Sequence, residues 1–142
     1  DRLGLSVELV VGLAQTPPLE SVPFVLLDVP CSGTGTLRRH PDARWRLTLD
    51  TLGRLSELQR QMLREASGLV PPGGCVVYST CTLEPEENEE QVEAFLAENP
   101  HFAVEETGRV DALYLDSEGR LMVLPQETDF DGAFAARLVR RA

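Results

Sequence analysis

Two short apolar segments on either side of one long amphipathic segment constrain the fold of this chain more than any other feature. Residues 23–28 and 75–79 are apolar runs of strand length. Between them, residues 51–70 repeat apolar side chains at helical spacing, and the Pro-Pro-Gly-Gly run at residues 71–74 ends that helix. Strand, helix and strand in this order predict a right-handed βαβ unit with two parallel strands.

Polar and thiol side chains follow both predicted strands. Asp28 and Cys31 come after the first strand, and Ser79 and Cys81 lie at the end of the second. Because the carboxyl ends of parallel strands meet at one edge of a sheet, we expect these four side chains to lie near one another. Both turns are rich in small hydroxyl residues, whose backbone N–H groups are expected to stabilise a thiolate. Two thiols and a carboxylate at one edge indicate sulfur chemistry on a substrate.

The rest of the chain predicts one more helix and several short strands. Pro85 is expected to open an acidic helix that ends before Asn99. The other expected elements are loops at residues 13–20 and 32–45, strands at 6–11, 102–106, 112–115, 121–124 and 133–139, and a hairpin turn at 116–119. With 142 residues, the chain is expected to form a single α/β domain, residues 1–142.

Composition excludes several classes of protein. The hydrophobic fraction of 42% disfavours disorder, and no apolar run approaches the ~20 residues of a membrane span, so no membrane partner is expected. Three cysteines are too few for a disulfide framework and indicate a reducing cytoplasm. Cys75, in mid-strand, is interpreted as a small buried hydrophobe. No metal site is expected, because no Cys-x-x-Cys pair occurs and His40 and His101 have no partner at ligand spacing.

Charge is distributed unevenly. The net charge of −10 opposes contact with phosphates, whereas four arginines, at positions 38, 39, 44 and 46, accompany the single acid Asp42. All basic residues are arginine, which reflects either codon bias or recognition of planar phosphate groups. The start at Asp1 rather than at a methionine indicates a processed chain or a fragment.

Two motifs carry a resemblance to a known family. Residues 26–45 (LLDVPCSGTGTLRRHPDARW) and 76–92 (VVYSTCTLEPEENEEQV) resemble the fourth and sixth motifs of the RsmB/Sun (NOL/NOP2/Sun-type) family of S-adenosylmethionine-dependent RNA 5-methylcytosine methyltransferases. Residues 131–140 (DGAFAARLVR) are similar to its closing strand. The resemblance covers nearly the whole chain but only the C-terminal half of the family's catalytic domain. It implies a partial Rossmann-like class I methyltransferase sheet, parallel with an antiparallel C-terminal hairpin and without its first strands.

The resemblance implies a role for each residue of the sheet edge. Cys81 would attack carbon 6 of cytosine, which makes carbon 5 nucleophilic, and Cys31 would assist release of the product. Asp28 and Pro30 would belong to the cofactor site, where Asp28 holds S-adenosylmethionine and the cytosine edge and Pro30 fixes the turn. Glu86, Glu87 and Asn88 match the family motif, but no chemical role is assigned to them.

The resemblance also implies an RNA partner. Arg38, Arg39 and His40 would approach the RNA backbone. The target base must leave its stack to reach a sulfur atom, so the expected substrate is single-stranded or looped RNA. Ribosomal RNA is the commonest bacterial target of the family.

The chain departs from the family at the cofactor site. The family's Ala-Pro-Gly-Gly-Lys loop and the acidic residue that contacts the ribose do not occur in this sequence, and Leu13 stands where an aspartate near the adenine is expected. In the family the first strand lies beside the fourth, so the strand at residues 23–28 is expected to have an uncovered edge that promotes self-association. We therefore expect negligible methyl transfer from this chain alone, and activity only as part of a longer enzyme.

Two alternatives remain. DNA cytosine 5-methyltransferases use a Pro-Cys thiol as the nucleophile, which would give Cys31 that role. Alternatively, the chain is a degenerate half-domain that binds RNA or oligomerises. The absent cofactor loop favours this second reading, and the intact Asp28, Cys31 and Cys81 disfavour it.

Overall fold

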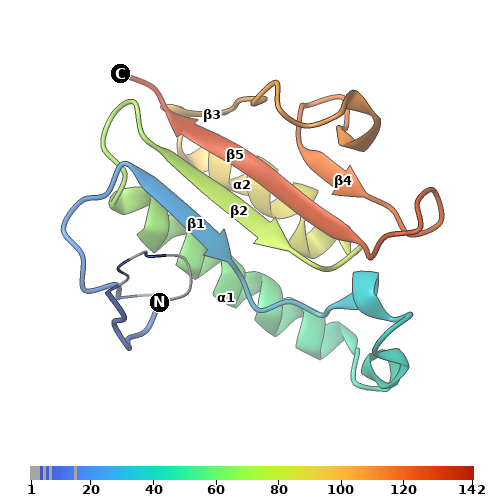
Figure 1. Cartoon of the computed structure of the whole chain (residues 1–142). Helices are drawn as coiled ribbons and strands as arrows, with labels where there is room; N and C mark the ends of the chain where they lie inside the picture. Colours follow the sequence, from blue (N-terminus) through green and yellow to red (C-terminus); the bar gives the residue numbers. More distant parts are fainter. Residues whose placement is uncertain (1–3, 5, 7, 15) are drawn as a thin grey trace.

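The computed structural model describes residues 4, 6, 8–14 and 16–142. Within them, one mixed sheet has the strand order β1-β2-β5-β3, and β4 also pairs with β5. Helices α1 (Leu49–Gly68) and α2 (Glu89–Glu98) both lie behind this sheet (Figure 1). The strands are β1 (Phe24–Asp28), β2 (Cys75–Thr80), β3 (Phe102–Val104), β4 (Leu121–Val123) and β5 (Ala133–Arg140).

The predicted βαβ unit is present. Strands β1 and β2 are parallel neighbours joined through α1, and their register sets Asp28 opposite Ser79. Both strands therefore end at the same edge of the sheet (Figure 1). Strand β5 runs antiparallel to β2 and β3, so the expected combination of a parallel pair with antiparallel C-terminal strands is confirmed.

The core lies between the sheet and the two helices. Alternation along β2 buries Val76 and Tyr78 completely against the helices, where they join Leu63 of α1 and Val92 of α2. Alternation along β1 turns Phe24 and Leu26 the other way, and these side chains are 71% and 75% exposed. Strand β1 is an edge strand, as expected.

The first helix begins and ends close to its predicted limits. Thr48 caps its N-terminus, since the side-chain oxygen accepts a hydrogen bond from the Thr51 N–H at 3.1 Å. After α1 the chain reverses through Gly73, whose φ of +83° is accessible mainly to glycine. No helix in the described residues has the length and apolar character that crossing a membrane requires.

The second helix differs from its prediction. Instead of a continuous helix from Pro85, a 3-10 turn (η3, Pro85–Glu87) precedes α2, and Asn88 separates them with φ −117° and ψ −99°. The side chain of Asn88 is hydrogen-bonded to the chain that leaves β2, so a tertiary contact decides its conformation.

Two predicted strands are wrong. Ser6 and residues 8–11 form no strand and Val7 lies outside the described residues; Leu9 and Val11 are exposed instead of packed beside a pairing partner. Ala112–Tyr114 is a 3-10 turn (η4), because the Asp111 side chain accepts a hydrogen bond from the Leu113 N–H and caps it. The hairpin turn at residues 116–119 is present, closed by a single bridge from Leu115 to Leu121. The loop at residues 32–45 contains two further 3-10 turns, η1 (Thr34–Thr36) and η2 (Pro41–Trp45).

Candidate active site

The two thiols that follow β1 and β2 meet at the shared edge of the sheet. Cys31 Sγ lies 3.4 Å from Cys81 Sγ. Cys81 is exposed and Cys31 is half-buried, whereas Cys75 is buried at the opposite end of β2. The predicted convergence of the two turn cysteines is confirmed.

A carboxyl group lies at the same edge. The Ser79 hydroxyl donates a hydrogen bond to Asp28 Oδ1 at 3.1 Å. Asp28 is exposed, so its carboxyl group can accept hydrogen bonds from a ligand. Pro30 is exposed at the start of the Cys31 turn, and its carbonyl accepts a hydrogen bond from the Gln59 side-chain amide at 2.9 Å.

The environment of the two cysteines makes them unequal. Burial raises the pKa of the Cys31 thiol to about 12 and outweighs a hydrogen bond with the Cys81 backbone that lowers it. The expected stabilisation of a thiolate is therefore wrong for Cys31, which stays protonated at neutral pH. Its S–H can donate to the sulfur of Cys81.

A buried hydroxyl cluster joins the two cysteine turns. Thr82, which is 1% exposed, lies with its Oγ1 2.6 Å from Ser32 Oγ and 2.9 Å from Thr34 Oγ1. The Leu83 N–H donates to Thr34 Oγ1 at 2.9 Å. These contacts tie the chain after β1 to the chain after β2, about fifty residues further along.

A second buried group behind the turns was missed in the sequence. The carboxyl oxygens of Glu87 accept hydrogen bonds from the Ser32 N–H at 3.0 and 3.1 Å and from Gln59 Nε2 at 2.8 Å. The adjacent Asn88 contacts Thr80 and the Thr82 carbonyl. An acidic run after a proline is typical of an exposed helix start, so the match of these residues to a family motif was the one available signal.

The predicted RNA-contact residues lie on the surface, and two of them contact other residues of the chain. Arg38 Nη2 donates to the Asp129 carbonyl at 2.9 Å, and Arg39 forms an ion pair with Asp131. His40 is exposed. The RNA-contact role of these three residues stays a prediction.

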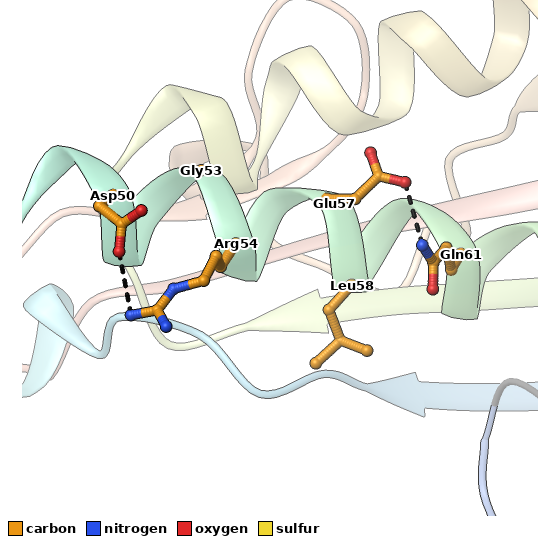
Figure 2. A pocket seen from close by; sticks show the side chains of 6 residues that line it. All are labelled: Asp50, Gly53, Arg54, Glu57, Leu58 and Gln61. Carbon is orange, nitrogen blue, oxygen red and sulfur yellow. Dashed lines mark hydrogen bonds and ion pairs between the residues drawn. The ribbon is translucent and has the colours of Figure 1, made fainter.

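The described residues also form a surface pocket along α1 (Figure 2). It has a volume of about 470 Å³ and is lined by Asp50, Gly53, Arg54, Glu57, Leu58 and Gln61. Two contacts join residues that line it, an ion pair from Arg54 to Asp50 at 3.2 Å and a hydrogen bond from Gln61 to Glu57 at 3.0 Å. Neither the paired thiols nor Asp28 lines this pocket, so we place the candidate active site at the open edge of the sheet. Within the part of the chain that the structure describes, no group of three His, Cys, Asp or Glu side chains could hold a metal ion.

Known proteins are similar to this chain along most of its length. Residues 2–139 match the family model described as 16S rRNA methyltransferase RsmB/F. The chain is 41% identical to ribosomal RNA small subunit methyltransferase B of Sodalis glossinidius, over 98% of this chain and 32% of that protein. It spans about a third of the length of such curated relatives.

Solved structures give the same picture of the fold. The crystal structure of PH0851 has a TM-score of 0.88 and 35% identity, over 98% of this chain and 32% of that one. The structure of NSun6 from Pyrococcus horikoshii with SFG has a TM-score of 0.68 and 28% identity, over 82% of this chain and 29% of that one. The predicted fold class, a partial Rossmann-like α/β sheet, is confirmed.

Proposed function

Because this chain belongs to the RsmB/F family of 16S rRNA methyltransferases, we propose that it is the nucleophile-bearing part of a longer enzyme that methylates carbon 5 of cytosine in RNA. The observation that carries the proposal is the 3.4 Å separation of Cys31 Sγ and Cys81 Sγ at an open sheet edge. Ribosomal RNA is the proposed substrate because the curated relatives are named for it. Residues 1–142 then correspond to the C-terminal half of the methyltransferase domain.

The exposure of Cys81 and the protonated state of Cys31 support Cys81 as the nucleophile. Its side chain is exposed, whereas Cys31 is half-buried and has a raised pKa. The Cys81 thiolate forms a bond to carbon 6 of cytosine, and the electron pair of the 5,6 double bond moves onto carbon 5. Carbon 5 is then able to take a methyl group. A water molecule at the exposed edge then takes the proton from carbon 5, the C–H electron pair restores the ring double bond, and the bond to Cys81 breaks to release the thiolate.

The protonated state of Cys31 supports a role in that last step. Its S–H lies within reach of the Cys81 sulfur and donates to it as negative charge returns there. A hydrogen bond to the departing thiolate stabilises it as a leaving group and lowers its tendency to add again. Cys31 thus assists product release without becoming an anion itself.

The residues at the edge fit part of an S-adenosylmethionine site. The exposed Asp28 carboxyl group, oriented by Ser79, can accept a hydrogen bond from the amino group of that molecule or of cytosine, and Pro30 fixes the adjoining turn. When bound, S-adenosylmethionine would supply an electrophilic methyl group. Since Leu13 offers no acidic group and the Ala-Pro-Gly-Gly-Lys loop does not occur in this sequence, we propose that the chain alone binds it weakly and transfers no methyl group.

The proposed substrate is single-stranded or looped RNA. Attack on carbon 6 needs the face of the base, which stacking covers in a duplex. Arg38, Arg39 and His40 are the proposed backbone contacts, and Arg39 would exchange the Asp131 carboxylate for a phosphate.

The test is covalent trapping with the full-length protein on RNA that carries 5-fluorocytosine. Fluorine replaces the proton that must leave carbon 5, so the adduct persists through denaturing electrophoresis. We expect the adduct in the wild type, its loss in Cys81→Ser and its persistence in Cys31→Ser. Loss in Cys31→Ser alone would transfer the nucleophilic role to Cys31, and the absence of any adduct would contradict the proposed chemistry.

A further inference from the structure

Two consecutive buried residues, Glu87 and Asn88, hold the two cysteine turns from behind. Glu87 is 0% exposed and Asn88 is 4% exposed. Glu87 contacts the turn that carries Cys31, and Asn88 contacts the turn that carries Cys81. One short segment between β2 and α2 therefore contacts both of the turns that carry the thiols.

On the Cys31 side, both neighbours of the cysteine are fixed. The Ser32 N–H donates to both carboxyl oxygens of Glu87, and Gln59 Nε2 donates to Glu87 Oε1 and to the Pro30 carbonyl at 2.9 Å. Gln59 comes from α1 and is completely buried. Tyr78 of β2 donates to the Glu87 carbonyl at 2.7 Å. The position of Cys31 is thus set from the helix layer and the central sheet.

On the Cys81 side, the same arrangement recurs. Thr80 Oγ1 donates to Asn88 Oδ1 at 2.5 Å, and Asn88 Nδ2 donates to the Thr82 carbonyl at 3.0 Å. Thr80 and Thr82 are the two neighbours of Cys81. Both the oxygen and the nitrogen of the Asn88 side-chain amide are hydrogen-bonded to this turn, and the backbone of Asn88 is not helical.

We propose that Glu87 with Gln59 on one side, and Asn88 on the other, are positioning residues that set the separation of the two sulfurs. The inference rests on the proposed function, because the separation matters when Cys31 donates to the sulfur of Cys81. A displacement of about 1 Å at reacting groups can cost about a hundredfold in rate. Glu87 and Gln59 thereby serve product release, and Asn88 serves the attack.

A cross-linking experiment on the full-length protein measures the separation without catalysis. Dibromobimane bridges two adjacent thiols when each sulfur displaces one bromide and forms a thioether, and peptide mapping by mass spectrometry identifies the Cys31–Cys81 bridge. Glu87→Gln replaces an acceptor of the Ser32 N–H by a donor, so we expect bridging relative to single alkylation to fall about fivefold. The matched control Glu90→Gln changes an exposed glutamate two helix positions away from Asn88 and should bridge like the wild type.

A second measurement separates the two chemical steps in the same full-length protein. In Glu87→Gln we expect adduct formation on 5-fluorocytosine RNA within about twofold of the wild type, while turnover on ordinary RNA falls about tenfold and the adduct accumulates. Asn88→Ala should instead slow adduct formation. Gln59→Met, which removes both donations from α1, replaces Glu87→Gln if circular dichroism shows that the latter does not fold.

The outcomes distinguish the inference from the proposed function. Equal bridging in Glu87→Gln and Glu90→Gln, or equal losses in both chemical steps, would overturn the positioning role and leave a merely structural one. A wild type that forms no adduct contradicts the proposed function, and the bridging ratio still decides whether Glu87 sets the sulfur separation.

Discussion

Cys31 Sγ and Cys81 Sγ lie 3.4 Å apart although fifty positions separate the two cysteines in the chain. The parallel register that sets Asp28 opposite Ser79 explains this contact, because Cys31 follows the end of β1 by three residues and Cys81 follows the end of β2 directly. Since side chains alternate along a strand, a register shift of one residue would turn Asp28 to the other face of the sheet and displace the Cys31 turn. The pairing of β1 with β2 therefore determines the site.

The raised pKa of Cys31 predicts a particular pH dependence of its alkylation. Because burial disfavours the thiolate and raises the pKa to about 12, the reactive fraction of Cys31 should grow about tenfold for each pH unit between 7 and 10. Iodoacetamide labelling followed by peptide mass spectrometry measures this rate. A plateau near pH 8 would contradict the assignment of Cys31 as a neutral thiol.

Gly35 should not tolerate a side chain. A Cβ there would lie 2.8 Å from the Cys81 carbonyl oxygen and 2.8 Å from Gly132 Cα, so Gly35→Ala must move residue 35 away from both backbones. We expect a loss of about 2 kcal/mol in the free energy of unfolding, measured with urea. Gly53→Ala on α1 meets open space and should stabilise the chain by up to about 1 kcal/mol. Similar stabilities for the two variants would refute the close approach.

Arg120 should contribute more to the stability of the fold than the surface arginines do. It is buried, and it donates to Asp116 Oδ2 at 2.6 Å and lies 3.4 Å from Glu93 Oε1. Arg120→Met leaves Asp116 without this partner and should cost about 3 kcal/mol, whereas Arg54→Met at an exposed pair should change stability by about 0.5 kcal/mol or less.

The Arg120–Asp116 ion pair also predicts how the stability cost of Arg120→Met depends on pH. Burial by itself raises the pKa of Asp116, but hydrogen bonds with Arg120 and Glu118 outweigh it and lower the pKa below 3.8. A lowered pKa in the folded state stabilises the fold above pH 3.8, and this contribution is lost as the pH falls further. The gap in stability between wild type and Arg120→Met should therefore narrow below pH 3.8 in acid titrations followed by circular dichroism.

Ser79 should act on the cofactor through Asp28. Ser79→Ala removes the donor to Asp28 Oδ1, a partly exposed hydrogen bond worth about 1 kcal/mol or less to stability. In the full-length protein we expect the KM for S-adenosylmethionine to rise severalfold while kcat stays nearly constant, because the change frees the Asp28 carboxyl group without touching a thiol. A fall in kcat with an unchanged KM would argue against this role.

The open face and edge of β1 predict self-association of the 142-residue chain. Phe24 and Leu26 expose apolar side chains on the face of the sheet opposite α1 and α2, and β1 has a free hydrogen-bonding edge within the described sheet. Sedimentation velocity should show a concentration-dependent increase in mass, which Leu26→Lys reduces. A wild-type chain that stays monomeric at all concentrations would remove this expectation.

Several elements could be predicted from the sequence because they depend on consecutive residues. The apolar runs of β1 and β2 indicate buried strands, and the helical spacing of apolar residues in α1 indicates which face of that helix is buried. A βαβ unit has one common handedness, which sets how these elements are arranged. The shared edge of Asp28, Cys31, Ser79 and Cys81 followed from that topology. The strand predicted at residues 112–115 failed because the Asp111 side-chain cap on the Leu113 N–H and the local backbone hydrogen bonds of the turn outweighed a weak strand pattern.

Amino-acid order alone thus determined strands β1 and β2, the long helix α1 and the meeting of two thiols at one edge. The tertiary structure alone decided that Glu87 is buried beneath Ser32, that Asn88 interrupts a helix, and that Cys31 keeps its proton. The physical reason is that periodicity belongs to neighbouring residues, whereas burial and hydrogen bonding of a polar group depend on which distant segments pack against it.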